Sequence, residues 1–134
     1  MKYLFVCIEN AGRSQAAEAF AKSMGLEAMS AGTIPAKEVN PVIRRLLEAR
    51  GIVAENMHPK LLNMDMIGWA DFVVTMGCSI ESVCPAVIID RMNVKKIAWN
   101  IEDPKGKGER EVARILDEIE EKVKSLKLSM QSED

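Results

Sequence analysis

Apolar residues in this chain occur in short continuous runs, separated by longer segments in which apolar positions recur with a helical period. The runs Lys2–Ile8 and Asp71–Met76 contain β-branched and aromatic residues and are typical of strands buried on both faces of a parallel sheet. Two other segments, Leu26–Ser30 and Val94–Trp99, are candidates for two further strands.

Helical periodicity appears between and after these strands. The first predicted helix, Gln15–Gly25, ends at a glycine, a common helix C-terminal signal. The second, Val42–Arg50, follows an Asn40-Pro41 start signal, and its predicted inward face consists of Val42, Leu46 and Ala49. Leu61–Trp69 predicts a weaker helix. The longest helix is predicted at Gly108–Leu126, with a buried stripe of Val112, Ile115, Leu116, Ile119 and Val123.

The alternation of strands and helices predicts the fold class. Right-handed crossovers through helices give an α/β domain of three layers, α/β/α, around a central four-stranded parallel sheet. The chain of 134 residues is long enough for one such domain. We expect a single domain over residues 1–127 and a disordered polar tail over residues 128–134.

The charge, the apolar stretches and the cysteines of the chain indicate its compartment and its classes of partner. The net charge of -2 gives no bulk attraction to nucleic acid or to an anionic membrane. The apolar stretch Tyr3–Ile8 is too short for the core of a signal peptide, and no run has the length of a membrane span. We therefore expect a cytoplasmic protein without nucleic-acid or membrane partners. In that compartment the three cysteines are thiols available for chemistry.

The loop between the first strand and the first helix carries the clearest chemical signal. Cys7 is followed six positions later by Arg13 and then by Ser14. A loop that enters a helix N-terminus directs backbone N–H groups at one point, and a guanidinium adds a charged fork. A thiol in that field loses its proton easily. The alternative is a buried core cysteine beside a surface arginine. The predicted oxyanion-binding residues are Ile8, Glu9, Asn10, Ala11, Gly12, Arg13 and Ser14.

This loop resembles the phosphate-binding loop of the low-molecular-weight protein tyrosine phosphatases and of the arsenate reductases that share their fold. Further segments resemble the same family in the same order along the chain. They are Ser30–Thr33, Val39–Pro41, Asp71–Cys78 followed by Cys84-Pro85, and Glu102-Asp103-Pro104. The resemblance implies a low-molecular-weight tyrosine phosphatase-like fold.

The resemblance also implies a role for individual residues. Cys7 matches the nucleophile and Arg13 matches the arginine that binds the oxyanion. Asn10 matches the residue that shapes the loop, and Ser14 the one that favours the deprotonated cysteine. Asp103 matches the acid that protonates the leaving oxygen, although an Asp-Pro pair also begins turns that have no chemistry.

The two branches of the family differ in the step that follows attack by the cysteine. A phosphatase hydrolyses phosphocysteine with water, whereas a reductase needs a second thiol to form a disulfide and release arsenite. Cys78 and Cys84 supply two further thiols, in either order. After Asp103-Pro104 the segment Lys105–Gly108 offers no aromatic ring to stack on a phenyl group, and its two lysines favour a small anion.

These observations favour an arsenate reductase whose substrate is arsenate, with phosphate as the related oxyanion. We expect no bound cofactor and an external thiol reductant, thioredoxin or another thiol system. One departure from the thioredoxin-coupled reductases is Gly12, where they often carry a cysteine. No metal site is expected, since the chain has one histidine and no paired cysteine ligands. A phosphatase acting on phosphate monoesters and a binding protein without turnover are the alternatives.

Overall fold

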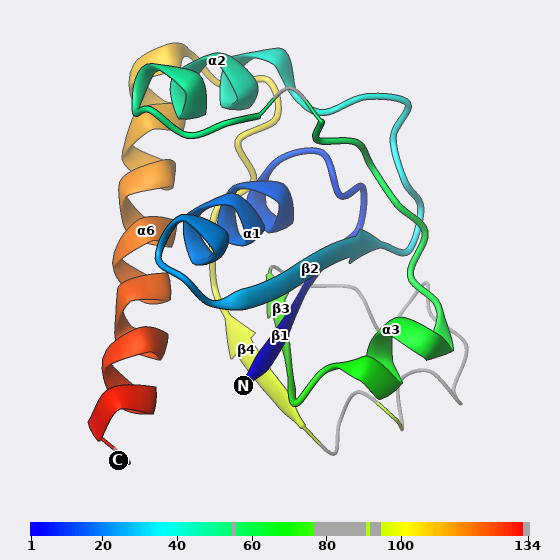
Figure 1. Cartoon of the computed structure of the whole chain (residues 1–134). Coiled ribbons are helices and arrows are strands. Elements are labelled where there is room, and N and C mark those ends of the chain that lie inside the picture. The colour runs from blue at the N-terminus through cyan, green and yellow to red at the C-terminus, as the bar shows by residue number, and fades with distance from the viewer. Residues whose placement is uncertain (55, 77–90, 92–94, 133–134) are drawn as a thin grey trace.

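The computed structural model describes residues 1–54, 56–76, 91 and 95–132, with side chains up to residue 129. Four strands form one sheet in the order β2-β1-β3-β4, and every neighbouring pair is parallel (Figure 1). The strands are β1 (Lys2–Cys7), β2 (Glu27–Gly32), β3 (Phe72–Met76) and β4 (Lys96–Trp99). The predicted four-stranded parallel sheet is confirmed.

Helices cover both faces of this sheet (Figure 1). Their bounds are α1 (Arg13–Ser23), α2 (Pro41–Ala49), α3 (Met64–Trp69) and α6 (Glu109–Ser132). Helices α1, α2 and α6 share one apolar core with the sheet, whereas α3 packs in a second core on the opposite face. This is the predicted three-layer arrangement. Among the described residues, no helix is long and apolar enough to cross a membrane.

Strand β1 lies at the centre of the fold because its side chains serve both cores in alternation. Phe5 and Cys7 belong to the core beneath α1 and α6, and Leu4 and Val6 belong to the core beneath α3. All four side chains are almost fully buried. An uninterrupted apolar run is the pattern such a strand requires, since neither face contacts water.

Helix α2 differs from the prediction in the face that it buries. Ile43 and Leu47 are fully buried, and Val42 and Leu46 pack at the edge of the core. Ala49, predicted to face inward, is exposed. The pair Val42 and Leu46 and the pair Ile43 and Leu47 both have i,i+4 spacing. The second pair is displaced from the first by one residue, which is about 100° around the helix, and periodicity alone does not choose between them. The predicted start is confirmed, because the Asn40 side chain accepts hydrogen bonds from the first turn.

Two helix boundaries differ from the prediction by more than two residues. Helix α3 begins at Met64 and not at Leu61, because Leu61 pairs with Gly32 in an isolated bridge and Asn63 caps the helix by accepting from the Met66 N–H. Helix α6 continues to Ser132, beyond the predicted end at Leu126. The division into a domain over residues 1–127 and a disordered tail over residues 128–134 stays a prediction.

Candidate active site

The candidate site lies where β1 ends and α1 begins. Cys7 is the last residue of β1 and Arg13 the first of α1, so residues 8–12 form a tight connection, which we call the oxyanion loop. Cys7 is 3% exposed and belongs to the core that the sheet shares with α1, α2 and α6. The carboxyl ends of parallel strands are where α/β proteins bind ligands.

Within the described part of the chain, two polar groups contact the Cys7 sulfur. The Asn10 N–H donates to Sγ at 3.2 Å, and the Ser14 hydroxyl oxygen lies 2.8 Å from it. Asn10 and Ser14 are fully buried. The Asn10 side-chain amide donates to Ser14 Oγ at 2.7 Å. The sulfur therefore has fixed polar contacts, although it lies at the edge of an apolar core.

The backbone of the oxyanion loop is turned toward the sulfur by the segment 33–40. The carbonyls of Ile8, Glu9 and Ala11 accept hydrogen bonds from the N–H groups of that segment, at 2.8 to 3.0 Å. In a planar trans peptide the carbonyl and the next N–H point in opposite directions. The N–H groups that follow these carbonyls thus point away from the segment 33–40, and the one at Asn10 donates to the Cys7 sulfur. Converging N–H groups of this kind form a cavity suited to an anion.

A close approach between the oxyanion loop and β2 makes this turn possible. A Cβ at Gly32 would lie 2.6 Å from the Ile8 carbonyl oxygen and 2.9 Å from the Asn10 backbone nitrogen. Asn10 itself has a positive φ of 51°, which asparagine tolerates better than most residues. Gly32 therefore provides the space that the loop occupies.

Arg13 connects the oxyanion loop to the segment that carries Asp103. Its Nη1 donates to the Ile101 carbonyl at 3.0 Å, and its Nη2 lies 3.8 Å from Asp103 Oδ2. The Arg13 side chain is 13% exposed and that of Asp103 is 59% exposed. Asp103 also accepts from the Lys105 N–H, the turn contact that its Asp-Pro sequence predicts. The structure thus brings Cys7, Arg13 and Asp103 to one place.

A hollow of about 490 Å³ opens beside these three residues. At its rim the Lys105 ammonium lies 3.0 Å from Glu9, and this carboxylate raises the pKa of Lys105 above its usual value. A Cβ at Gly12 would lie 3.1 Å from Pro104, so the loop and the Asp103 segment are in close contact. Among the described residues that line the hollow, none is aromatic.

Cys78 and Cys84 lie outside the described residues, so the structure places neither of them. Sequence reasoning also missed residues that support the loop. Gln15, which is 1% exposed, donates to the Asn10 side chain, and Gly32 lies against the Asn10 backbone. The Lys60 N–H also donates to the Asn10 side chain. The position of Gly32 just after the predicted strand Leu26–Ser30 was the available signal, because a glycine there can indicate a close approach of another backbone segment. For Gln15, helical periodicity gives no signal, because it does not distinguish a buried amide from a solvated one.

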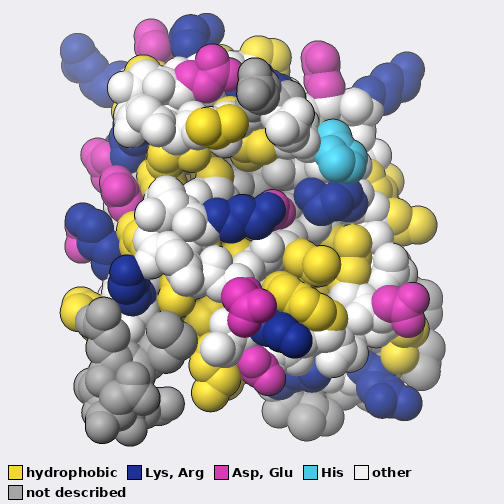
Figure 2. Space-filling model, in the orientation of Figure 1, with side chains coloured by type: hydrophobic (Ala, Val, Ile, Leu, Met, Phe, Trp, Pro, Cys, Tyr) yellow, Lys and Arg dark blue, Asp and Glu magenta, His cyan; other side chains and the backbone are white. Residues whose placement is uncertain are grey.

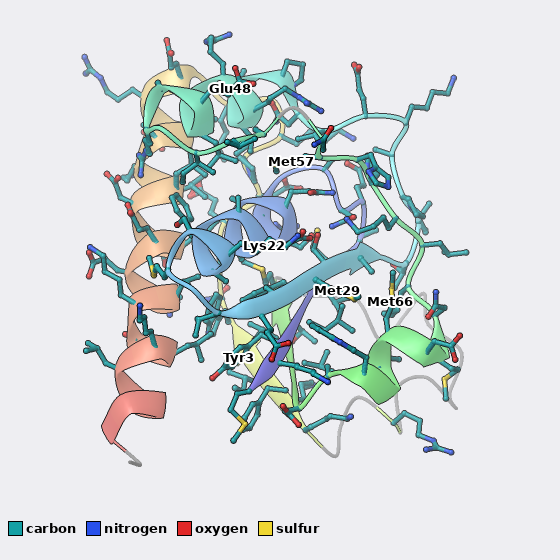
Figure 3. All side chains as sticks on the ribbon, viewed as in Figure 1. Tyr3, Lys22, Met29, Glu48, Met57 and Met66 are labelled. Carbon is teal, nitrogen blue, oxygen red and sulfur yellow. The ribbon has the colours of Figure 1, made fainter. Side chains whose placement is uncertain are left out.

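A second hollow, of about 690 Å³, lies between α1, β2 and residues 51–60. Figure 2 shows this face, where hydrophobic side chains are interrupted by basic ones. Lys22, Met29, Met57 and Met66 surround the hollow (Figure 3). Gln15 lines it too, so this glutamine stands between the second hollow and the oxyanion loop.

The fold and the site define a class of small α/β proteins with a buried thiol beneath an anion-sized loop at the end of the first strand. A family model described as low molecular weight phosphotyrosine protein phosphatase matches residues 2–134. The chain belongs to this family.

Relatives within the family include arsenate reductases. Arsenate reductase 2 from Staphylococcus haemolyticus is 34% identical over 92% of this chain and 93% of the relative. An arsenate reductase structure from Archaeoglobus fulgidus is 38% identical, with a TM-score of 0.74 over 92% of this chain and 97% of that one. A thioredoxin-dependent arsenate reductase from Corynebacterium glutamicum is 33% identical, with a TM-score of 0.80 over 99% of this chain and 63% of that one.

Phosphatases share the fold as well. The structure of an arginine phosphatase from Geobacillus stearothermophilus is 26% identical, with a TM-score of 0.86 over 98% of this chain and 94% of that one. The likeness of overall shape therefore extends to both kinds of enzyme. Sequence identity is higher to the arsenate reductases, and the comparisons favour that interpretation over the phosphatase.

Proposed function

We propose that this protein reduces arsenate to arsenite, with Cys7 as the nucleophile. The observation that carries the proposal is the hollow around Cys7, which combines a polar-contacted thiol, an arginine and a carboxyl group but offers no aromatic wall among its described residues. Such a site suits a small tetrahedral oxyanion better than an aryl ester.

Each side chain has a role in the first step. The Cys7 thiolate attacks arsenic, so that an S–As bond forms and an As–O bond breaks. Arg13 and the N–H groups of the oxyanion loop bind the remaining oxygens. Asp103 gives its proton to the departing oxygen, which leaves as water. The 3.8 Å between Arg13 and Asp103 lets both groups contact one bound anion.

The second step uses a further thiol, Cys78 or Cys84. Its thiolate attacks Cys7 Sγ, so that a disulfide forms and the S–As bond breaks with its electron pair on arsenic. Arsenic is reduced from As(V) to As(III), and the two thiols are oxidised. An external dithiol such as thioredoxin then reduces the disulfide. A reducing cytoplasm is the setting in which such a cycle can repeat.

The experiment that tests this proposal compares single cysteine variants in two assays. Cys7→Ser should abolish both arsenate reduction and hydrolysis of a small aryl phosphate, because both begin with attack by Cys7. Cys78→Ser or Cys84→Ser should abolish arsenate turnover and leave the hydrolysis in place. Full arsenate turnover in both single variants would exclude the thiol relay. Aryl phosphate hydrolysis without any arsenate reduction in the unsubstituted protein would identify a phosphatase.

A further inference from the structure

Gln15 is a buried polar side chain to which the proposed reaction gives no role. It lies on the inner side of α1, next to Ser14, and is 1% exposed. Its side-chain nitrogen lies 3.1 Å from the Asn10 carbonyl oxygen, 3.0 Å from Asn10 Oδ1 and 2.7 Å from the His58 carbonyl oxygen. A backbone carbonyl can only accept a hydrogen bond, so the atom that faces these oxygens must be the amide nitrogen.

The orientation of Gln15 bears on that of Asn10. Asn10 Oδ1 receives hydrogen bonds from Gln15 and from the Lys60 N–H, at 3.0 and 2.9 Å. With its oxygen held between two donors, the Asn10 amide must present its nitrogen to Ser14. The observed contact of 2.7 Å from Nδ2 to Ser14 Oγ agrees with this orientation.

The direction of the next hydrogen bond follows. Ser14 Oγ accepts from Asn10, so its own hydrogen is available for the Cys7 sulfur, 2.8 Å away. A hydroxyl that donates to sulfur stabilises the thiolate, whereas one that accepts from a thiol stabilises the protonated form. The same asparagine supplies the other donor, its N–H at 3.2 Å from Sγ. Both hydrogen bonds to the sulfur therefore depend on how Asn10 is held.

We propose that Gln15 is a positioning residue, which orients Asn10 so that Ser14 and the Asn10 N–H both donate to the Cys7 thiolate. Gln15 does this without contact to the sulfur or to the bound anion. The inference rests on the proposed role of Cys7 as nucleophile and adds the residue that maintains its charged form. Charged groups that line the same hollow as Cys7 also act on the thiolate, and every variant below retains them: Glu9, Arg13, Glu38, Asp103 and Lys105.

The test measures alkylation of Cys7 by iodoacetamide against pH, with the Cys7 peptide quantified by mass spectrometry so that other thiols do not contribute. Gln15→Met keeps the size of the side chain and removes its donors. We expect its profile to shift to higher pH, with alkylation near pH 7 about five- to tenfold slower than in the unsubstituted protein. The plateau rate at high pH should be unchanged, since both proteins are then fully deprotonated.

Lys22→Met is the matched control. Lys22 lies on α1 and lines the second hollow, as Gln15 does, but its ammonium bonds to Glu18 and not to the oxyanion loop. The substitution should leave the profile where it is. Gln15→Leu is the second variant if Gln15→Met does not fold, as judged by circular dichroism. Its side chain adds no charge and cannot donate to the three oxygens, so the shift should have the same direction.

Coincident profiles for the Gln15 variant and the unsubstituted protein would overturn the inference and leave the proposed function intact. An equal shift in Lys22→Met would overturn it as well, because the effect would then be general to the helix. If the unsubstituted protein is alkylated with the pH profile of an ordinary free thiol, the role of Cys7 as nucleophile fails and the positioning role of Gln15 fails with it.

Discussion

Gly32 shows how one residue of the sheet can limit the shape of the site. The space that a Cβ would need there is occupied by the Ile8 carbonyl and the Asn10 backbone. The oxyanion loop cannot move away freely, because its carbonyls are bonded to residues 34–40. The geometry beneath the anion thus depends on a residue that has no side chain to contribute.

Gly32→Ala should therefore destabilise the protein and displace the oxyanion loop. Overpacking at a rigid site costs about 1–3 kcal/mol of unfolding free energy, and we expect a loss of arsenate turnover with it. Urea denaturation and steady-state kinetics measure the two effects. Gly68→Ala is the matched control, because a Cβ at Gly68 meets nothing within 4 Å and alanine is the better helix former. Equal stability of the two variants would contradict this account of Gly32.

Arg13 has two partners that a lysine cannot serve together. Its guanidinium donates to the Ile101 carbonyl and also lies beside Asp103. We expect Arg13→Lys to lower kcat/KM for arsenate by about 10²–10³-fold, the usual effect of removing an oxyanion donor. The unfolding free energy should fall by only about 1 kcal/mol, because one hydrogen bond is lost. Steady-state rates and urea midpoints on the same sample separate the two effects. Activity that falls only in step with stability would speak against a role in anion binding.

At this scale the sequence predicts the residues that carry reactive groups and misses those that support them. Cys7, Arg13 and Ser14 are recognisable from their spacing between a strand and a helix, because the chemistry of anion binding requires those residue types. Gln15 acts through contacts with residues 10 and 58, which are set by tertiary structure. No local pattern contains that information.

The segment after β4 presents Asp103 and is attached to α6 by an exposed cluster of charges. Glu102 lies 3.1 Å from the Lys107 ammonium and 3.3 Å from the Arg114 guanidinium. The Lys107 hydrogen bond, followed by its charge and by Arg114, holds the pKa of Glu102 below its ordinary value of 4.5. This cluster supports the segment in addition to the hydrogen bond from Arg13 to the Ile101 carbonyl.

The lowered pKa of Glu102 determines how the stability of the folded protein depends on pH. The carboxylate stabilises the folded protein above pH 4.5, and the contribution is lost as the pH falls through the lower pKa of the folded state. Glu102→Gln should reduce the urea midpoint slightly near pH 7, and the difference from the unsubstituted protein should shrink toward about pH 3. Glu48→Gln, an exposed carboxylate on α2, serves as control. A difference that grows on acidification would contradict the assignment.

Predictions for the elements succeed where burial alone determines the pattern. Strands β1 and β3 are found because each is an apolar run that is buried almost throughout, whereas β2 and β4 include polar, exposed positions. Helix α2 is found, but its inward face is offset by one residue. Helix α3 is shortened at its start by a bridge between Leu61 and Gly32, a long-range contact that local sequence does not encode.

For the whole molecule, parallel topology explains why residues far apart in sequence meet. Because β1, β3 and β4 are parallel neighbours, their carboxyl ends lie on one edge of the sheet. Cys7 is the last residue of β1, and Asp103 lies in the segment that follows β4. The segment with Cys78 and Cys84 follows β3, which lies between the two. This order of strands is the topological basis of the proposed thiol relay.

A single turnover tests this account most directly. Fully reduced protein is mixed with arsenate and no other reductant, and free thiols and arsenite are then counted in the same sample, with Cys7→Ser as the control. We predict the loss of two thiols for each arsenite formed, and no change in the control, because the electrons come from the protein's own cysteines. If the reduced protein loses no thiols and forms no arsenite, that result contradicts an internal disulfide mechanism.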